Sequence, residues 1–171
     1  MLKKIIIGIL ILALLFVIYI FSAFKAIQLT SGKMEPTLMR GSTYYVWNFL
    51  FAPKQIQKSS VYLFKRGGEE DFGRVIAQEG DRIKLSKGEI YINDAQLAEA
   101  YLVEYKSGDI TINNKFKTYP MGDWLLEDVT VTVPQNSFFI LGDNRTNSND
   151  SRSNNLEFVS KNEITGVFLI K

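Results

Sequence analysis

The sequence predicts an all-β domain, a β-barrel or sandwich, joined to one N-terminal transmembrane helix. Two observations predict this class: an uncharged apolar run near the N-terminus and, after it, short β-branched or aromatic segments separated by turn residues. No long helical period appears after residue 26. A chain of 171 residues has room for the anchor and one domain. We therefore expect an anchor over residues 1–25 and one domain over residues 26–171.

The apolar run covers residues 5–24 and contains no charged side chain. As a helix with a rise of about 1.5 Å per residue, it spans the hydrocarbon core of a lipid bilayer, which is about 30 Å thick. Lys3 and Lys4 flank one end and Lys25 flanks the other. The positive-inside rule therefore places the N-terminus in the cytoplasm and the main domain outside the cell. The alternative is a cleaved signal peptide, for which this apolar run is long.

Short segments rich in branched and aromatic residues predict the strands of the main domain. Turn signals at residues 86–88 and 93–94 predict hairpins. Residues from about 95 to 128 are richer in Lys, Asn, Asp and Tyr, so we expect a cap or insertion there. The apolar patch at residues 47–52 is either core or a surface that enters the membrane beside the anchor. The expected strands are residues 44–47, 61–64, 74–77, 82–85, 89–92, 129–133, 138–141 and 166–170.

The composition excludes several kinds of chemistry. The chain contains no cysteine and no histidine, so it has no disulfides, no thiol nucleophile, no Ser-His-Asp triad and no His-ligated zinc. With 20 basic and 18 acidic residues, its charge gives no reason to expect a nucleic-acid partner. The polar run at residues 146–155 lacks the spacing of a calcium loop, and we expect neither a metal nor a cofactor.

Three segments, in this order after the anchor, resemble the conserved boxes of the type I signal peptidase family (S26). Residues 31–38 (SGKMEPTL) resemble the box that carries the family's nucleophilic serine. Residues 73–81 (GRVIAQEGD) resemble the box of its general-base lysine, and residues 90–94 (IYIND) resemble the strand that follows. Residues 142–152 (GDNRTNSNDSR) resemble the third box. The resemblance implies the family's β fold and a peptidase in which a buried, neutral lysine activates a serine.

The sequence departs from the family pattern at both catalytic positions. Lys33 stands at the position of the nucleophile, and Gly73 stands at the position of the general base. Losing either member of such a pair costs several powers of ten in rate, so the resemblance implies an inactive member. Ser31 occupies the position of a hydroxyl that the family uses as an oxyanion donor. Ser42 and Asn155 are smaller departures, and the second one affects the expected shape of the pocket.

The residues that support the site in the family are retained. Asp150 forms a salt bridge with Arg145 or Arg152 in the alternative, purely structural interpretation of the third box. The side chain of Met34 is expected to fill apolar space. The retained residues are Met34, Pro36, Asp143, Arg145, Ser148, Asp150 and Arg152.

Two other lysines are candidates for a displaced catalytic amine. Ser31 and Lys33 are two residues apart, so on an extended strand they project to one face and could form a Ser-Lys pair. This requires a Lys33 that is buried strongly enough to be neutral. Lys65 is the second candidate, and its alternative role is a solvated charge at the end of a strand.

The resemblance extends to signal-peptidase-like factors of Gram-positive bacteria that lack the catalytic pair. It implies a non-catalytic role in sortase-dependent pilus assembly, in which the former substrate cleft binds a pilin precursor or positions the sortase. The first alternative is an active signal peptidase that cleaves the signal peptides of exported precursors through a displaced Ser-Lys pair. The second is a structural surface protein that makes no use of the cleft.

Overall fold

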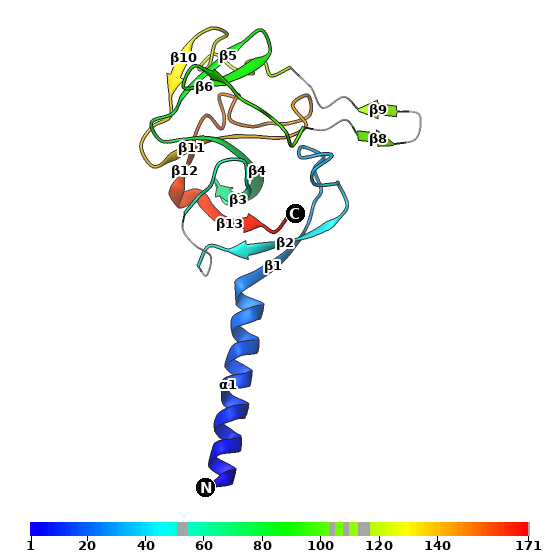
Figure 1. Cartoon of the computed structure of the whole chain (residues 1–171), viewed down its shortest axis with the longest axis vertical. Coiled ribbons are helices and arrows are strands. Elements are labelled where there is room, and N and C mark those ends of the chain that lie inside the picture. Colours follow the sequence, from blue (N-terminus) through cyan, green and yellow to red (C-terminus); the bar gives the residue numbers. More distant parts are fainter. Residues whose placement is uncertain (51–54, 103–104, 108–109, 113–116, 171) are drawn as a thin grey trace.

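The computed structural model describes residues 1–50, 55–102, 105–107, 110–112 and 117–170. Its first element is the helix α1 (Leu2–Ala23), which extends away from the strands (Figure 1). Within the segment Lys3–Ala23, an 18-residue stretch has a mean hydropathy of 3.1 and none of its residues is buried against the rest of the described chain. By length and composition, α1 can therefore cross a membrane, as expected for the anchor.

The remainder of the chain is mainly β, which confirms the predicted fold class. The larger sheet has seven strands, and each neighbouring pair is antiparallel. Its strands, in spatial order, are β1 (Phe24–Gln28), β2 (Thr43–Asn48), β13 (Ile164–Phe168), β3 (Val61–Arg66), β4 (Glu69–Gln78), β11 (Ser137–Leu141) and β12 (Val159–Ser160).

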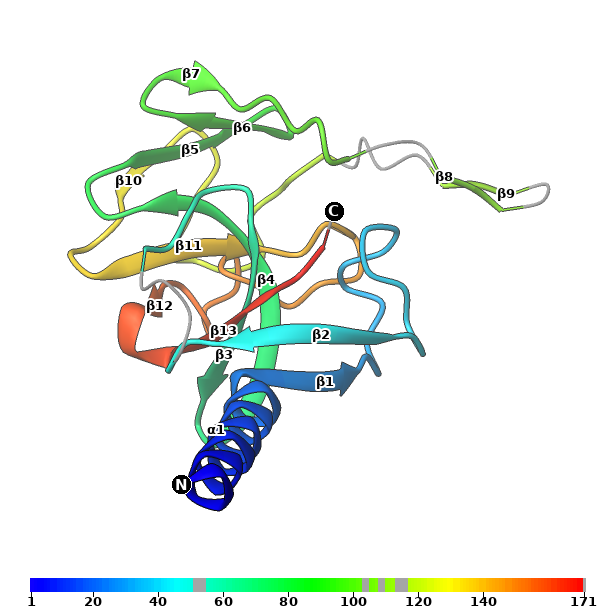
Figure 2. The same cartoon turned by 60° about the horizontal axis from the view of Figure 1, so that its bottom comes forward.

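A smaller sheet lies at the end of the domain remote from α1 (Figures 1 and 2). A separate pair of strands extends to one side in both views, and the 3-10 helix η1 (Lys161–Glu163) precedes β13. The smaller sheet contains β10 (Thr130–Thr132), β5 (Arg82–Ser86), β6 (Glu89–Ile92) and β7 (Ala95–Gln96), and the separate pair is β8 (Tyr105–Ser107) with β9 (Ile110–Ile112). The predicted boundaries of the anchor and of the cap remain predictions, although β7 shows that the segment after residue 95 begins by extending this sheet.

Three hairpins turn through two residues that both have positive φ. These residues are 67–68 (φ 60° and 92°), 87–88 (52° and 81°) and 93–94 (52° and 68°). Two successive positive φ values are the signature of the type I′ turn, whose twist matches that of antiparallel strands. The turns predicted from residues 86–88 and 93–94 are thereby confirmed.

The core consists of three apolar clusters, one of which supports the segment that follows β1. In this cluster Met34 and Leu38 are fully buried beside Val46, Leu63 and Phe72. The backbone N–H of Asp143 also contacts Met34 Sδ at 3.4 Å. The buried side chain of Met34 therefore holds the backbone of its neighbour Lys33 in place against the core.

Of the apolar patch at residues 47–52, part packs in the core and part is exposed, so its membrane contact stays a prediction. Phe49 packs edge-on against Tyr62, with 6.1 Å between the ring centroids, whereas Leu50 is 81% exposed. Trp47 stacks on Phe24, the first residue after α1, at 6.1 Å. Residues 51–52 lie outside the described residues.

Candidate functional site

The segment after β1 and the loop after β11 meet at a cleft of about 710 Å³. They are held together by Asn144, whose backbone N–H donates to the Lys33 carbonyl at 2.9 Å and whose Nδ2 donates to the Gly32 carbonyl at 3.3 Å. The first and third sequence boxes are thus brought together at one place. The cleft is lined by Ser31, Lys33, Asp71, Met121, Thr146, Asn147, Ser148, Asn149, Ser153 and Asn155.

The side chain of Lys33 is a paired cation. Its Nζ donates to both carboxylate oxygens of Asp71, each at 2.8 Å, and to the carbonyl oxygen of Asn149 at 3.0 Å. The three bonds match the three N–H donors of an ammonium group. Nζ also lies 5.7 Å from the centroid of the Phe72 ring, a favourable position for a cation. The nucleophile position therefore holds a charge with its hydrogen-bonding capacity already used.

Asp71 is the functional residue that the sequence interpretation missed. It lies in β4, two residues before Gly73, so the alternation of a strand directs both positions to the same side of the sheet. Its side chain is 37% exposed and that of Lys33 is 8% exposed. The carboxylate therefore neutralises Lys33 and still faces the cleft.

The position of the general base is closed by core packing. A Cβ atom built on Gly73 would lie 2.6 Å from Cγ2 of Ile140 and 3.1 Å from the carbonyl oxygen of Leu141. Ile140 is completely buried, and its Cγ2 is a branched methyl group with little freedom to move. A side chain at position 73 would therefore require Ile140 to shift within the core.

The two candidate amines for a displaced pair point elsewhere. Ser31 Oγ accepts a hydrogen bond from the backbone N–H of Lys33 at 3.3 Å, while the ammonium of Lys33 is held by Asp71. Lys65 is exposed and lies opposite Glu70 in the β3–β4 register. Among the described residues, no hydrogen bond joins a serine hydroxyl to a lysine amine.

Asp143 connects the three boxes from beneath the cleft. It is completely buried and accepts from Arg74 Nε at 2.8 Å, from Arg74 Nη2 at 2.5 Å and from Thr37 Oγ1 at 2.5 Å. The Arg74 guanidinium in turn lies 4.1 Å from the centroid of the Tyr101 ring. Pro36, which precedes Thr37 in the first box, is half-buried and follows a cis peptide bond.

The remaining charged residues of the third box form two separate ion pairs. Asp150 accepts from Arg152 Nε at 2.8 Å and from Arg152 Nη2 at 2.9 Å. Arg145 instead pairs with Glu99, a residue that the sequence interpretation did not single out, and donates to Thr118 Oγ1 at 2.5 Å. Burial lowers the pKa of Arg145, but the hydrogen bonds and the charge of Glu99 outweigh it and raise this pKa above its ordinary value.

Ser148 carries a buried hydroxyl with no hydrogen-bond partner among the described residues. The side chain lines the cleft, and the residue is 7% exposed. The resemblance implies that the third box supports the catalytic lysine, and no amine extends from Gly73 to meet it. A buried hydroxyl without a hydrogen-bond partner is uncommon in folded proteins.

The part of the chain that the structure describes contains no group of three or more acidic side chains placed to hold a metal ion. What the cleft offers a ligand is the carboxylate of Asp71, the hydroxyl of Ser31, and the amides of Asn147, Asn149 and Asn155. These groups suit hydrogen bonding to a peptide backbone.

Comparison with known proteins gives a family match and several relatives. The family model described as "Signal peptidase, peptidase S26" matches residues 2–170. The chain is 31% identical over 145 residues to "Signal peptidase I U" of Bacillus subtilis (strain 168), a match that covers 84% of this chain and 72% of the relative. It is 36% identical over 143 residues to "Signal peptidase I" of Bacillus caldolyticus, with coverages of 79% and 72%.

A third relative differs in its name. The chain is 28% identical over 136 residues to "Inactive signal peptidase IA" of Staphylococcus aureus (strain Mu50 / ATCC 700699), a match covering 80% of this chain and 71% of the relative. Among solved structures, a signal peptidase I from Enterococcus faecalis V583 matches with 26% identity and a TM-score of 0.48, over 68% of this chain and 98% of that one. The family match over nearly the whole chain, with two relatives above 30% identity, shows that this protein belongs to the signal peptidase family S26.

Proposed function

We propose that this chain is a membrane-anchored, non-catalytic member of the family, which uses the cleft to bind a pilin precursor or a sortase during pilus assembly. The observation that carries the proposal is the state of the two catalytic positions. Lys33 is bonded to Asp71 where a hydroxyl should attack, and Ile140 occupies the space where a base should begin.

The chemistry of the cleft supports loss of catalysis. A general base needs a free lone pair within hydrogen-bond reach of the nucleophile. The ammonium of Lys33 has none, because its three donors already meet Asp71 and Asn149. Ser31 retains its hydroxyl, which forms no hydrogen bond with a lysine amine of the described residues.

The same cleft keeps the features of a binding site. Its volume of about 710 Å³ falls within the range of about 300–1,000 Å³ that is common for ligand sites. Exposed amides at Asn147 and Asn149 can pair with the backbone of an extended peptide, and Met121 adds an adaptable apolar contact. The partly exposed carboxylate of Asp71 can accept a further hydrogen bond from such a peptide.

The proposed topology places the cleft outside the cell. Lys3 and Lys4 precede the apolar core of α1, and Lys25 follows it. Lys25 is paired with Glu70, with Nζ to carboxylate distances of 2.6 and 2.7 Å. Two lysines and the N-terminal amino group thus lie at the start of the helix and one lysine lies at its domain end, and this excess of basic groups favours the N-terminal end as the cytoplasmic one.

The test combines binding and cleavage in one preparation. The full chain in nanodiscs is mixed with a purified pilin precursor or the membrane sortase of the same cell, and complex formation and precursor mass are both followed. We expect binding without cleavage. Cleavage that Ser31→Ala abolishes would establish instead an active peptidase with a displaced pair.

Matched variants locate the binding surface. Asn147→Trp places a bulky ring in the cleft, and Thr132→Trp places the same ring on an exposed position of β10. We expect Asn147→Trp to weaken binding at least about ten-fold, equivalent to about 1.4 kcal/mol, and Thr132→Trp to leave it unchanged. Equal affinities for both variants would show that the cleft is not the binding site.

A further inference from the structure

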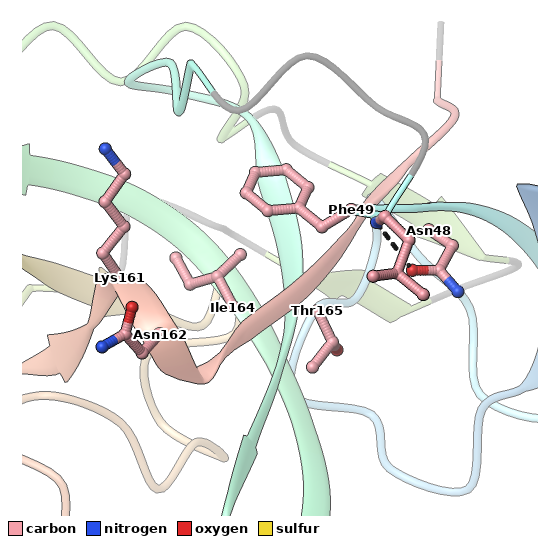
Figure 3. Close-up of a pocket in the computed structure, with 7 residues that line it drawn as sticks. Asn48, Phe49, Lys161, Asn162, Ile164 and Thr165 are labelled. Carbon is pink, nitrogen blue, oxygen red and sulfur yellow. Dashed lines mark hydrogen bonds between the residues drawn. The ribbon is translucent and has the colours of Figure 1, made fainter.

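A second pocket, separate from the Lys33 cleft, lies between the end of β2 and the start of β13. Its volume is about 610 Å³. The side chains of Phe49, Ile164 and Lys161 project to the same side of the ribbon (Figure 3). We call it the Leu50 pocket; its lining residues are Asn48, Phe49, Leu50, Lys161, Asn162, Ile164 and Thr165.

The Leu50 pocket lies beside the domain end of the membrane helix. Phe24, the first residue after α1, is paired with Trp47 in the β1–β2 register and stacks on its ring. Leu50 follows Trp47 by three residues, so it lies within about 10 Å of it, the length that three residues reach in a fully extended chain. Figures 1 and 2 both show the end of β2 next to this end of α1. With α1 across a bilayer, the pocket therefore faces the zone of lipid headgroups.

The pocket has an apolar wall. Ile164 is buried and Phe49 packs on the core at Tyr62, so both present fixed apolar surface. Leu50 is 81% exposed, with its backbone N–H bonded to Asn48 Oδ1 at 3.1 Å. An exposed leucine beside an apolar wall suits the upper part of a lipid chain.

The rim of the pocket carries one uncompensated cation. Lys161 is exposed, and its ammonium forms no salt bridge with any residue that the structure describes. The nearby carboxylate of Glu163 is engaged by Arg66, with two bonds of 2.6 Å. The neighbouring amides of Asn48 and Asn162 add neutral donors. This rim is complementary to a phosphate group.

We propose that the Leu50 pocket binds an anionic phospholipid of the bilayer that holds α1. The acyl chain lies against Phe49 and Ile164, Leu50 enters the hydrocarbon boundary, and the lipid phosphate pairs with Lys161. The domain then has a second attachment to the membrane besides α1. This attachment limits its tilt and sets the height of the Lys33 cleft above the membrane.

Depth in the membrane is tested with single labels, which the absence of cysteine in the chain makes straightforward. An environment-sensitive fluorophore is attached to Asn162→Cys at the pocket and to Ala95→Cys on β7, which lies at the far end of the domain (Figure 2). In nanodiscs with headgroup-level spin-labelled lipids, we expect strong quenching at position 162 and none at position 95. Equal quenching at the two positions, or none at either, would overturn the proposal.

Lipid preference is tested by native mass spectrometry of the full chain released from nanodiscs of equal phosphatidylglycerol and phosphatidylcholine. We expect retained phosphatidylglycerol to be enriched, and Lys161→Gln to lower this enrichment about five-fold, as one basic residue near an anionic surface contributes about 1 kcal/mol. Lys117→Gln, on the distal side near Gly88, is the matched control with no expected effect.

The variant Leu50→Asp distinguishes lipid bound in the Leu50 pocket from lipid that surrounds α1. We expect it to reduce quenching at position 162 and to leave the membrane anchoring of the chain intact. Unchanged enrichment in Lys161→Gln together with unchanged quenching in Leu50→Asp would overturn the proposal that a lipid occupies the pocket. None of these readouts depends on peptide binding at the Lys33 cleft.

Discussion

The ammonium of Lys33 lies 2.8 Å from each carboxylate oxygen of Asp71, which is two residues before Gly73 in β4. The resemblance predicts a hydroxyl at position 33, and the structure has a charged pair there instead. The pair is unevenly buried, with 8% of the Lys33 side chain and 37% of the Asp71 side chain exposed. Such a pair supports the local structure only while both partners are present.

We expect Asp71→Ala to lower the free energy of unfolding by about 2 kcal/mol, because it leaves a buried ammonium with one carbonyl partner; the partial exposure of Asp71 keeps the loss below that of a fully buried pair. Lys33→Met, which removes the charge and keeps the volume, should cost less than about 1 kcal/mol. Urea unfolding of the full chain in micelles, followed by tryptophan fluorescence, measures both. Equal losses for the two variants would contradict this asymmetry.

Restoring the two catalytic side chains alone should not restore peptidase activity. In Lys33→Ser/Gly73→Lys, the new lysine meets the methyl group of Ile140 at its root and the carboxylate of Asp71 on the same face of β4. The first contact displaces the side chain, and the second holds the amine in its charged form.

Adding Ile140→Ala and Asp71→Asn to that double variant should produce detectable cleavage of a signal-peptide substrate, measured by mass spectrometry. Ile140→Ala costs about 2–5 kcal/mol of stability, so Ile140→Ala alone is the control for folding. Activity in the double variant would show that Ile140 and Asp71 do not close the site.

Most of the fold could be predicted from local patterns, because alternation and turn residues are local properties. All eight expected strands appear, but β1 (Phe24–Gln28) was missed because its five residues, FKAIQ, directly follow the apolar run and do not alternate regularly between apolar and polar. β7 and β12 have two residues each, too few for alternation to appear.

The residues of the candidate site that belong to the three sequence boxes could be predicted. Those whose role depends on the register between paired strands could not. Lys33 and Gly73 follow from the boxes, and the i, i+2 rule for a strand could have added Asp71. The role of Ile140 could not be foreseen. It depends on how β11 pairs with β4, and the register shifts between Phe139 and Ile140. The pairing of Arg145 with Glu99 likewise joins segments that no local pattern connects.

The orphaned hydroxyl of Ser148 predicts an unusual response to mutation. Ser148→Ala removes a buried polar group without a partner among the described residues, so we expect the free energy of unfolding to rise by about 1 kcal/mol. Ser151→Ala is the matched control, since Ser151 Oγ accepts from the backbone N–H of Ile140 at 2.9 Å. It should lower stability by about 1–2 kcal/mol. A loss of stability in Ser148→Ala would show that its hydroxyl is satisfied in the folded protein.

Acid stability should depend on Glu163. Hydrogen bonds from Arg66 lower the pKa of this carboxyl, and their effect, with a backbone bond from Ser160 and the charge of Arg66, exceeds the opposing effect of burial. The folded pKa therefore lies below the unfolded value of about 4.3. The resulting stabilisation is fully present above that value and is lost as the pH falls through the folded pKa.

We expect Glu163→Gln to be less stable than the parent at pH 7, and the difference to shrink as the pH falls below about 4. Asp123→Asn, a change at an exposed carboxylate, should give a pH profile parallel to the parent. Urea unfolding at a series of pH values compares the three proteins. Because the pair also holds η1 through the bond from Ser160 N to Glu163 at 2.7 Å, its loss should loosen the start of β13 first. A difference between Glu163→Gln and the parent that stays constant down to pH 3 would mean that the Arg66–Glu163 pair does not shift the titration of this carboxyl.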